Sequence, residues 1–271
     1  MKIAFIGGGN MGEAMLSALL DKRISSSQDV VVSDTAESRR QHIKQKYGVG
    51  VTADNQLAIS KTNVIVLAVK PQNLPDVITQ LGGQLNPGQL LLSIIAGARL
   101  DTICTGLKHL PAVRAMPNTP AQIGQGITVW TATEEVNEQQ KQWARAILGA
   151  IGQEIYVEKE SDIDMATAVS GSGPAYFFLF VEALSNAAVE IGLSRDVAEK
   201  LVLQTILGSG HLIQQSGKSP ADLRRMVTSP GGTTAEAISE LEKGQFTDLI
   251  ARAVQAAYNK ARELGDSNPR L

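Results

Sequence analysis

The chain has 271 residues, 43% of them hydrophobic and 19% charged, which is enough apolar material for one large domain or two ordinary ones. Its 25 Lys and Arg nearly balance its 27 Asp and Glu, and the formal net charge of -2 argues against a protein that binds nucleic acid or an anionic membrane. The single cysteine, Cys104, excludes an intramolecular disulfide and a cysteine-rich metal site. No leader segment is expected, and no apolar run approaches the ~20 residues of a membrane span, so we expect a cytoplasmic protein.

The first half of the chain alternates short apolar runs with helical patterns. The runs predict strands at residues 1–6, 30–32, 64–69, 90–94 and 112–114, with two further edge strands at 126–130 and 154–157. Helical patterns lie between them at residues 11–19, 37–47, 75–85, 99–107 and 137–151. Continuous apolar strands joined by helices are typical of a parallel sheet covered on both faces. We therefore expect an α/β domain over residues 1–158.

From about residue 160 onward, Ala- and Leu-rich helical patterns replace the strands, so residues 159–271 are expected to form an all-α domain. The predicted helices span residues 162–191, 195–215, 220–227, 234–243 and 247–264. Pro174 should break or kink the first of these helices near Gly171–Pro174, because proline lacks a backbone N–H. Residues 176–181 are apolar around the whole helix, which predicts a helix buried on all sides, with a partner chain completing the burial.

A glycine motif follows the first strand. Gly7-x-Gly9-x-x-Gly12 is weak as a bare pattern, but here it lies between an apolar strand and an amphipathic helix, as a dinucleotide fingerprint requires. Gly7 permits the tight turn, Gly9 lets the backbone approach a pyrophosphate, and Gly12 allows close helix packing. Free N–H groups at the helix start attract phosphate oxygens. The alternative is a glycine turn that only joins strand to helix; we predict a Rossmann-type dinucleotide-binding domain.

The choice of dinucleotide depends on the end of the second strand. Asp34 lies 22 residues after Gly12, close to the ~20 expected for a carboxylate that binds the ribose 2'-hydroxyl of NAD. Ser33, Thr35, Arg39 and Arg40 lie near it in sequence, and hydroxyl and guanidinium groups are what a 2'-phosphate needs. Either arginine could instead be a solvated helix residue. The sequence leaves NADH and NADPH both open.

A second glycine-rich stretch, residues 227–236, precedes a predicted helix. Thr233 and Glu236 have the spacing of a capping box. Free N–H groups between Gly231 and Thr234 would attract a small anion such as a substrate carboxylate. An ordinary loop with a good N-cap is the alternative reading.

What is absent also constrains the chemistry. The histidines at positions 42, 109 and 211 are scattered, so no metal site is expected, and no residue has the pattern of a strong general acid or base. Lys70–Pro71 and Met116–Pro120 follow strands at the edge where open α/β sheets bind ligands, although both could be rigid loop starts. Reduction of a C=N bond suits this inventory, because a protonated imine is already electrophilic and a nicotinamide supplies the hydride.

With these residues together, the chain resembles the pyrroline-5-carboxylate reductases, which catalyse the last step of proline biosynthesis. The resemblance spans almost the whole length and rests on residues 5–11, 68–72, 113–120, 170–176 and 227–234. It implies an α/β Rossmann-type dinucleotide-binding domain (1–158) followed by an all-α dimerisation and substrate-binding domain (159–271). It also implies a homodimer through the C-terminal helices, with active sites between one subunit's nucleotide domain and the partner's helices. Related enzymes also form larger rings of dimers.

The resemblance further implies site residues. Ser229, Gly231, Gly232 and Thr233 would hold the substrate carboxylate, and the hydroxyl of Thr234, the expected catalytic residue, would reach the ring nitrogen. Glu160 matches another position that can contact the ligand. The implied cofactor residues are Ile6, Gly7, Gly8, Gly9, Asn10, Met11, Ser33, Asp34, Asn55, Ala68, Val69, Lys70, Pro71 and Ala96, with Asn118 and Thr119 near the nicotinamide. Many members that favour NADPH carry a neutral or basic residue where Asp34 stands, since a carboxylate would repel a 2'-phosphate.

The expected reaction is hydride transfer from NADPH or NADH to 1-pyrroline-5-carboxylate, giving L-proline. Two alternatives remain open at this point. One keeps the fold but reduces another cyclic imino acid or a hydroxy acid. The other is a nucleotide-sensing module without catalysis, against which the second ligand site argues.

Overall fold

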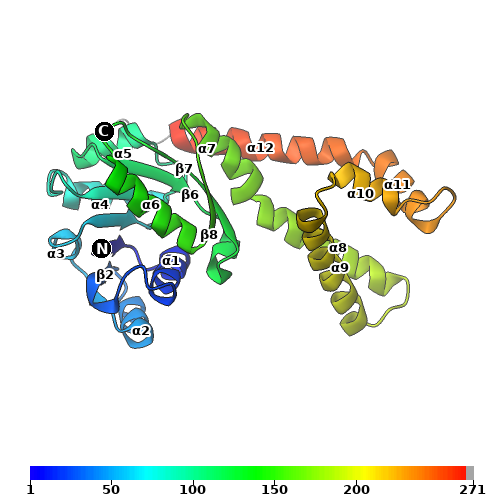
Figure 1. The fold of residues 1–271 in the computed structure, drawn as a ribbon, viewed down its shortest axis with the longest axis horizontal. Coiled ribbons are helices and arrows are strands. Elements are labelled where there is room, and N and C mark those ends of the chain that lie inside the picture. The colour runs from blue at the N-terminus through cyan, green and yellow to red at the C-terminus, as the bar shows by residue number, and fades with distance from the viewer. Residues whose placement is uncertain (267–271) are drawn as a thin grey trace. The chain divides into compact units, whose positions relative to one another are not determined.

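Short runs of apolar residues form an eight-stranded sheet in the order β3-β2-β1-β4-β5-β6-β7-β8 (Figure 1). The computed structural model describes residues 1–266. The strands are β1 (Ile3–Ile6), β2 (Val30–Ser33), β3 (Gly50–Thr52), β4 (Val64–Leu67), β5 (Leu90–Ser93), β6 (Ala112–Met116), β7 (Gly126–Ala132) and β8 (Gly152–Tyr156). Strands β1 to β6 are parallel, as predicted. The strand order reverses between β1 and β4, where open α/β sheets bind ligands.

The sheet departs from the prediction beyond β6. Strand β7 runs antiparallel to β6 and lies between β6 and β8, so it is not an edge strand. A short 3-10 segment, Thr119–Ile123, connects β6 to β7, and so short a connection suits antiparallel neighbours. Helix α6 (Glu138–Ala150) joins β7 to β8, which pair in parallel, and β8 is the true edge.

Besides short 3-10 turns, one strand and one α-helix were not predicted: strand β3 and helix α3 (Asn55–Ile59). The strand has only three residues and pairs with β2 alone, so no apolar run marks it in the sequence. Asp54 begins the helix by accepting hydrogen bonds from the backbone N–H groups of Gln56 and Leu57.

Helices cover both faces of the sheet. On one face lie α1 (Asn10–Asp21), α2 (Glu37–Tyr47) and α6; on the other lie α3, α4 (Leu74–Leu81) and α5 (Leu100–Leu107). Successive strand residues supply the two cores in turn: Ile3 and Phe5 belong to the first, Ala4 and Ile6 to the second. All four are at most 1% exposed, which explains why β1 is apolar at every position.

Residues 161–266 are helical apart from their short connections, as predicted. Their elements are α7 (Ser161–Ala166), a π-helical turn (Thr167–Gly171), α8 (Gly173–Glu190), α9 (Arg195–Ser216), α10 (Pro220–Met226), α11 (Thr233–Lys243) and α12 (Phe246–Asp266). The expected break in the helix over 162–191 is confirmed, but it is the π turn that interrupts it. Pro174 lies in the first turn of α8, where its missing N–H costs no hydrogen bond.

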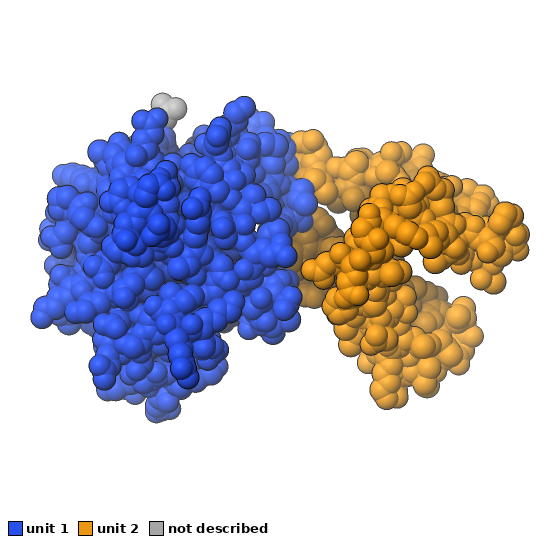
Figure 2. All heavy atoms as spheres, in the orientation of Figure 1, with its two compact units in different colours: residues 1–172, 256–271 blue, residues 173–255 orange. Residues whose placement is uncertain are grey.

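The chain divides into two compact units, residues 1–172 with 256–266, and residues 173–255 (Figure 2). The first unit therefore continues past the predicted domain boundary after residue 158 and includes α7, the π turn and the end of α12. The boundary between residues 158 and 159 stays a prediction.

The apolar helix α8 differs from the expectation in this single chain. The side chains at 177, 178 and 179 are 65–67% exposed, so α8 is not buried on all sides within its own unit. Among the helices of residues 1–266, none combines the length and apolar character that a bilayer crossing requires.

Candidate active site

The turn between β1 and α1 has the geometry of a dinucleotide cradle. Gly7 has a φ of +101°, and a Cβ atom there would lie 2.7 Å from the carbonyl oxygen of Ala68, so the turn requires glycine. At Gly9, a Cβ would meet no atom of residues 1–266 within 4 Å. Gly9 lines an open cleft, where a side chain would fill the space that a pyrophosphate needs. Helix α1 begins at the next residue, so its first N–H groups are available to phosphate oxygens.

The cleft has a volume of about 490 Å³, within the range of small-molecule sites. The predicted cofactor residues that line it are Ile6, Gly7, Gly9, Ser33, Asp34, Asn55, Ala68, Val69 and Lys70. They come from the carboxyl ends of β1, β2 and β4 and from the start of α3. The structure thus brings these residues together at one edge of the sheet.

The predicted cofactor residues and the residues that line the cleft do not match completely. Gly8, Asn10, Met11 and Pro71 adjoin lining residues in sequence, whereas Ala96, Asn118 and Thr119 are not among the lining residues. Thr35, one of the hydroxyl residues beside Asp34, also lines the cleft, and five further residues line it without having been predicted: Gln72, Asn73, Asp76, Val77 and Gln80. These five belong to the 3-10 turn after Lys70 and to α4. In the sequence, the only indication of their role was the predicted ligand position at Lys70–Pro71, which directly precedes them.

Asp34 braces the glycine turn. Its Oδ2 accepts a 2.8 Å hydrogen bond from the N–H of Gly8, and its Oδ1 accepts a 2.9 Å bond from the N–H of Ala36. The carboxylate therefore fixes both the glycine turn and the end of β2 while it lines the cleft. This position keeps a negative charge where the adenosine ribose of a dinucleotide would lie.

The two arginines considered for a 2'-phosphate are engaged elsewhere. Arg39 donates to the carbonyl oxygen of Gly8 and to the carboxylate of Glu13. Arg40 donates to the carbonyl oxygens of Asp34 and Thr35 at 2.7 and 2.9 Å. Both guanidinium groups thus stabilise the protein beside the cleft rather than standing unpaired in it.

Glu13 is the centre of the polar cluster that joins α1 to α2. Burial by itself raises the pKa of Glu13, but hydrogen bonds from Lys46, His42, Tyr47 and Arg39 outweigh it and lower the pKa to about 2. The carboxylate is therefore ionised at neutral pH. The cluster holds α2 against the helix whose N-terminus faces the cleft.

A side-chain hydrogen bond ties the segment after β6 to strand β7. The Asn118 Oδ1 atom accepts a 2.9 Å hydrogen bond from the N–H of Ile127, at the start of β7. This bond orients the side-chain amide and leaves its carbonyl oxygen engaged. Asn118 and Thr119 therefore sit on a loop anchored at both β6 and β7.

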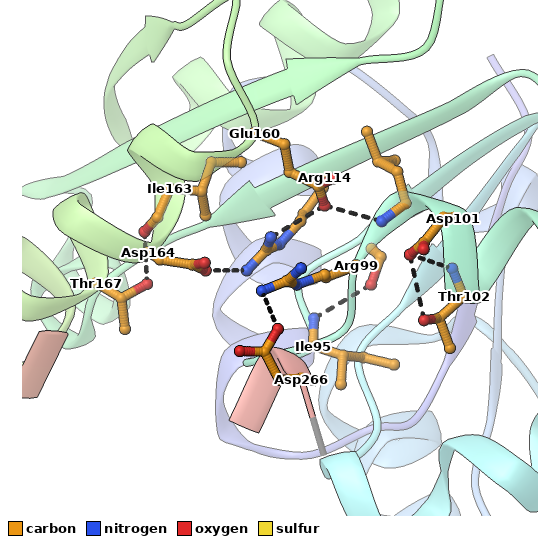
Figure 3. A network of polar contacts seen from close by, with 12 residues as sticks. Ile95, Arg99, Asp101, Thr102, Arg114, Glu160, Ile163, Asp164, Thr167 and Asp266 are labelled. Atoms are coloured by element: carbon orange, nitrogen blue, oxygen red, sulfur yellow. Dashed lines mark hydrogen bonds and ion pairs between the residues drawn. The ribbon is translucent and has the colours of Figure 1, made fainter. Parts of the chain in front are cut away.

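Glu160 lies in a polar network with a buried arginine (Figure 3). Arg114, on β6, donates to Glu160 Oε1 at 2.9 Å and to Asp164 Oδ1 at 2.6 Å. Glu160 Oε1 also accepts a 2.8 Å bond from the N–H of Leu100, the first residue of α5. Thus Glu160, predicted as a ligand contact, holds β6 and α5 in this unit.

The second predicted site lies in the other unit, in the loop from Ser229 into α11. Gly231 has a φ of +69°, and the N–H of Gly232 donates to the carbonyl oxygen of Ser229 at 3.0 Å. The predicted capping box is wrong: α11 begins at Thr233, and its N-cap is Gly232, which has no side chain to form one. Thr233 is exposed and Thr234 half-buried, both in the first turn of an 11-residue helix.

His109 is buried, at 4% exposed. Burial lowers the pKa of His109, partly offset by its 2.8 Å hydrogen bond to the carbonyl oxygen of Gln89. Within residues 1–266, no three His, Cys, Asp or Glu side chains gather closely enough to hold a metal ion.

Comparisons with known proteins match both parts of the chain. Residues 160–264 match the family model described as pyrroline-5-carboxylate reductase dimerisation. Residues 2–97 match the model described as NADP oxidoreductase, coenzyme F420-dependent.

Similarity to individual proteins extends over nearly the whole chain. The pyrroline-5-carboxylate reductase of Synechocystis is 42% identical over 98% of this chain and 98% of its own length, and that of Pseudomonas aeruginosa is 39% identical over 98% and 97%. The structure of the Plasmodium falciparum pyrroline carboxylate reductase with NADP bound matches with a TM-score of 0.87 and 32% identity, over 98% of each chain. The structure of a pyrroline-5-carboxylate reductase from Coxiella burnetii matches with a TM-score of 0.87 and 38% identity, over 97% of this chain and 98% of its own.

Proposed function

Because this chain belongs to the pyrroline-5-carboxylate reductase family, we propose that the cleft at Gly7–Gly9 binds NAD(P)H and that the Ser229–Thr234 loop binds the substrate. The chain is an oxidoreductase that reduces 1-pyrroline-5-carboxylate to L-proline, the final step of proline biosynthesis. Bound NAD(P)H supplies the hydride that this reduction consumes.

The residues of this chain position the reactants rather than attack them. The turn at Gly7–Gly9 and the N–H groups of α1 would hold the pyrophosphate, while Asp34 and Ser33 would meet the adenosine ribose. Asn118 and Thr119, at the end of β6, would lie beside the nicotinamide. The parallel sheet supports this placement of the cofactor, because the carboxyl ends of β1, β2 and β6 lie at the same edge.

On the substrate side, the N–H groups of the first turn of α11 and the positive end of this helix suit a carboxylate. The Thr234 hydroxyl would donate a hydrogen bond to the ring nitrogen and polarise the C=N bond. Reduction adds a hydride to the ring carbon and leaves a proton on the nitrogen, so a donor beside the nitrogen assists the step. Glu160 would contribute a further ligand contact.

The observation that carries the cofactor assignment is the open space at Gly9 in a cleft lined by the ends of three parallel strands. The test is oxidation of NADPH and of NADH by purified protein with 1-pyrroline-5-carboxylate, beside 1-pyrroline, which lacks the carboxylate. We expect fast turnover of the acid and slow turnover of the analogue. Cofactor binding without turnover of either imine would overturn the proposed reaction, and failure to bind either cofactor would overturn the cofactor assignment.

We propose that the chain forms a homodimer through its C-terminal helices, which the match of residues 160–264 to a dimerisation domain supports. The exposed aromatic and aliphatic side chains of α8 supply the apolar surface such an interface buries. We propose in addition that dimers assemble into a larger ring and that each active site combines one subunit's cleft with the partner's helices. Sedimentation velocity should separate a dimer from a multiple of it. A cytoplasmic location completes the proposal, in keeping with one unpaired thiol, Cys104.

A further inference from the structure

The π-helical turn Thr167–Gly171 touches the strand that leads to the nicotinamide loop. A Cβ atom added at Gly171 would lie 3.1 Å from Cε of Met116, closer than side chains normally pack. Met116 is the last residue of β6, and Pro117 connects it to Asn118. π turns within helices occur frequently at functional sites, and this one presents a glycine to a residue two positions before Asn118.

A buried ion-pair network fixes this π turn relative to β6. Arg114 and Met116 are two residues apart on one strand, so both side chains point to the same face. Val113 and Ala115, which alternate with them, belong to the core on the opposite face. Arg114 binds Asp164 of α7 and Glu160 just before it (Figure 3), and the π turn follows α7 directly.

The ion pairs of Arg114 and the packing of Met116 against Gly171 both restrict the end of β6. Arg114 is 2% exposed and its two partner carboxylates hold α7 against the strand. Gly171 then sets the space that the Met116 side chain can occupy. A displacement that reaches the Met116 backbone passes to Asn118 through a single proline, whose fixed φ makes the connection stiff.

We propose that Gly171 is a positioning residue for hydride transfer: its missing side chain lets Met116 pack against the π turn, and this packing sets the position of the Pro117–Thr119 segment beside the nicotinamide. The inference rests on the proposed function, which places Asn118 and Thr119 near that ring. Gly171 itself touches neither substrate nor cofactor in this account.

The test is Gly171→Ala, with Gly149→Ala as the matched control. Gly149 lies in α6, and a Cβ there would meet no atom of residues 1–266 within 4 Å, so the same chemical change displaces nothing. For Gly171→Ala we expect kcat to fall about 10-fold, with the KM for NADPH changed less than about twofold, since small misplacements of reacting groups are costly. The deuterium isotope effect on kcat, measured with NADPH labelled at the transferred position, should rise. Gly149→Ala should leave all three values unchanged.

Replacing Met116 with the shorter leucine should restore activity to the Gly171→Ala variant. In the double variant Gly171→Ala/Met116→Leu, the Cε atom that the new methyl group meets is gone, and at least half of the lost kcat should return. A merely structural glycine would give a different pattern: activity would fall in step with the thermal midpoint, the isotope effect would stay constant and the leucine would restore nothing. That pattern, or a Gly171→Ala enzyme indistinguishable from Gly149→Ala, would overturn the inference.

A readout without turnover separates this inference from the proposed function. Fluorescence of the reduced nicotinamide in the binary complex should differ between Gly171→Ala and wild type and not between Gly149→Ala and wild type. A wild-type protein that binds NADPH but does not reduce the imine would contradict the proposed function, whereas unchanged nicotinamide fluorescence in Gly171→Ala would contradict the positioning role.

Discussion

Arg114 Nη2 and Asp164 Oδ1 lie 2.6 Å apart, and their side chains are 3% and 8% exposed. The pair joins β6 to α7, which are 50 positions apart in sequence. A buried arginine requires compensation because desolvation of its charge is costly, and here Asp164 and Glu160 provide it. The network therefore couples the strand that leads to Asn118 with the segment that precedes α8.

Removing the arginine should destabilise the fold strongly. Arg114→Met leaves the carboxylate of Asp164 buried beside a thioether, and we expect the free energy of unfolding to fall by about 3–5 kcal/mol. Urea denaturation of the two proteins measures it. The exposed pair Lys141–Glu138 is the control, since Lys141→Met should cost at most about 1 kcal/mol. A loss below 1 kcal/mol in Arg114→Met would show that the buried pair contributes no more than a surface pair.

The Thr234 hydroxyl should matter for the imine and not for the cofactor. Thr234→Ala is expected to lower kcat/KM for 1-pyrroline-5-carboxylate by about 1–3 kcal/mol equivalent, the scale of a lost buried hydrogen bond. The Kd of NADPH should stay the same. Ser239→Ala removes a hydroxyl farther along α11 and should change neither quantity. Equal weakening of NADPH binding in Thr234→Ala would mean that the loop is structural.

Asp34 should bias the enzyme against a 2'-phosphate. Asp34→Asn removes the negative charge and retains one carbonyl oxygen for the N–H of Gly8, so the ratio of kcat/KM for NADPH to that for NADH should rise. Asp76→Asn removes a charge elsewhere in the same cleft and serves as the comparison. If the ratio does not rise in Asp34→Asn, or rises equally in both variants, Asp34 does not lie at the ribose.

His109 should make the fold less stable below about neutral pH. Burial lowers its pKa from 6.5, so the folded state binds a proton less readily than the unfolded state does. The stability is fully present above pH 6.5 and declines as the pH falls through 6.5 toward the lower folded value. Thermal unfolding of wild type and His109→Gln between pH 5 and 8 tests this.

In His109→Gln, the glutamine amide can still donate to the carbonyl oxygen of Gln89 but does not titrate. The stability of this variant should therefore decline less than that of the wild type as the pH falls. The exposed His211 provides the control, because His211→Gln should keep the wild-type slope. Identical slopes in all three proteins would contradict the role of His109.

Much of the fold and part of the candidate site could be read from local patterns. The apolar run Ile3–Ile6, the glycines that follow it and the amphipathic α1 form one continuous strand, turn and helix, so short-range sterics and periodicity suffice to predict them. The break before α8 was also expected near Gly171–Pro174, although the structure makes the interruption a π turn rather than a proline kink.

Other features depend on pairings between distant segments. Strand β3 has only three residues and gains its structure from hydrogen bonds to β2, and the direction of β7 is fixed by its register with β6. The Gly8 partner of Asp34 and the two carboxylate partners of Arg114 could not be inferred from composition, since each lies more than 25 positions away in the chain. The sequence by itself determined the strand–helix alternation and the chemistry of the glycine turn, because those depend on neighbouring residues. Only the tertiary structure decided which charges compensate one another and which residues meet Gly171, because these contacts depend on how the strands and α7 pack.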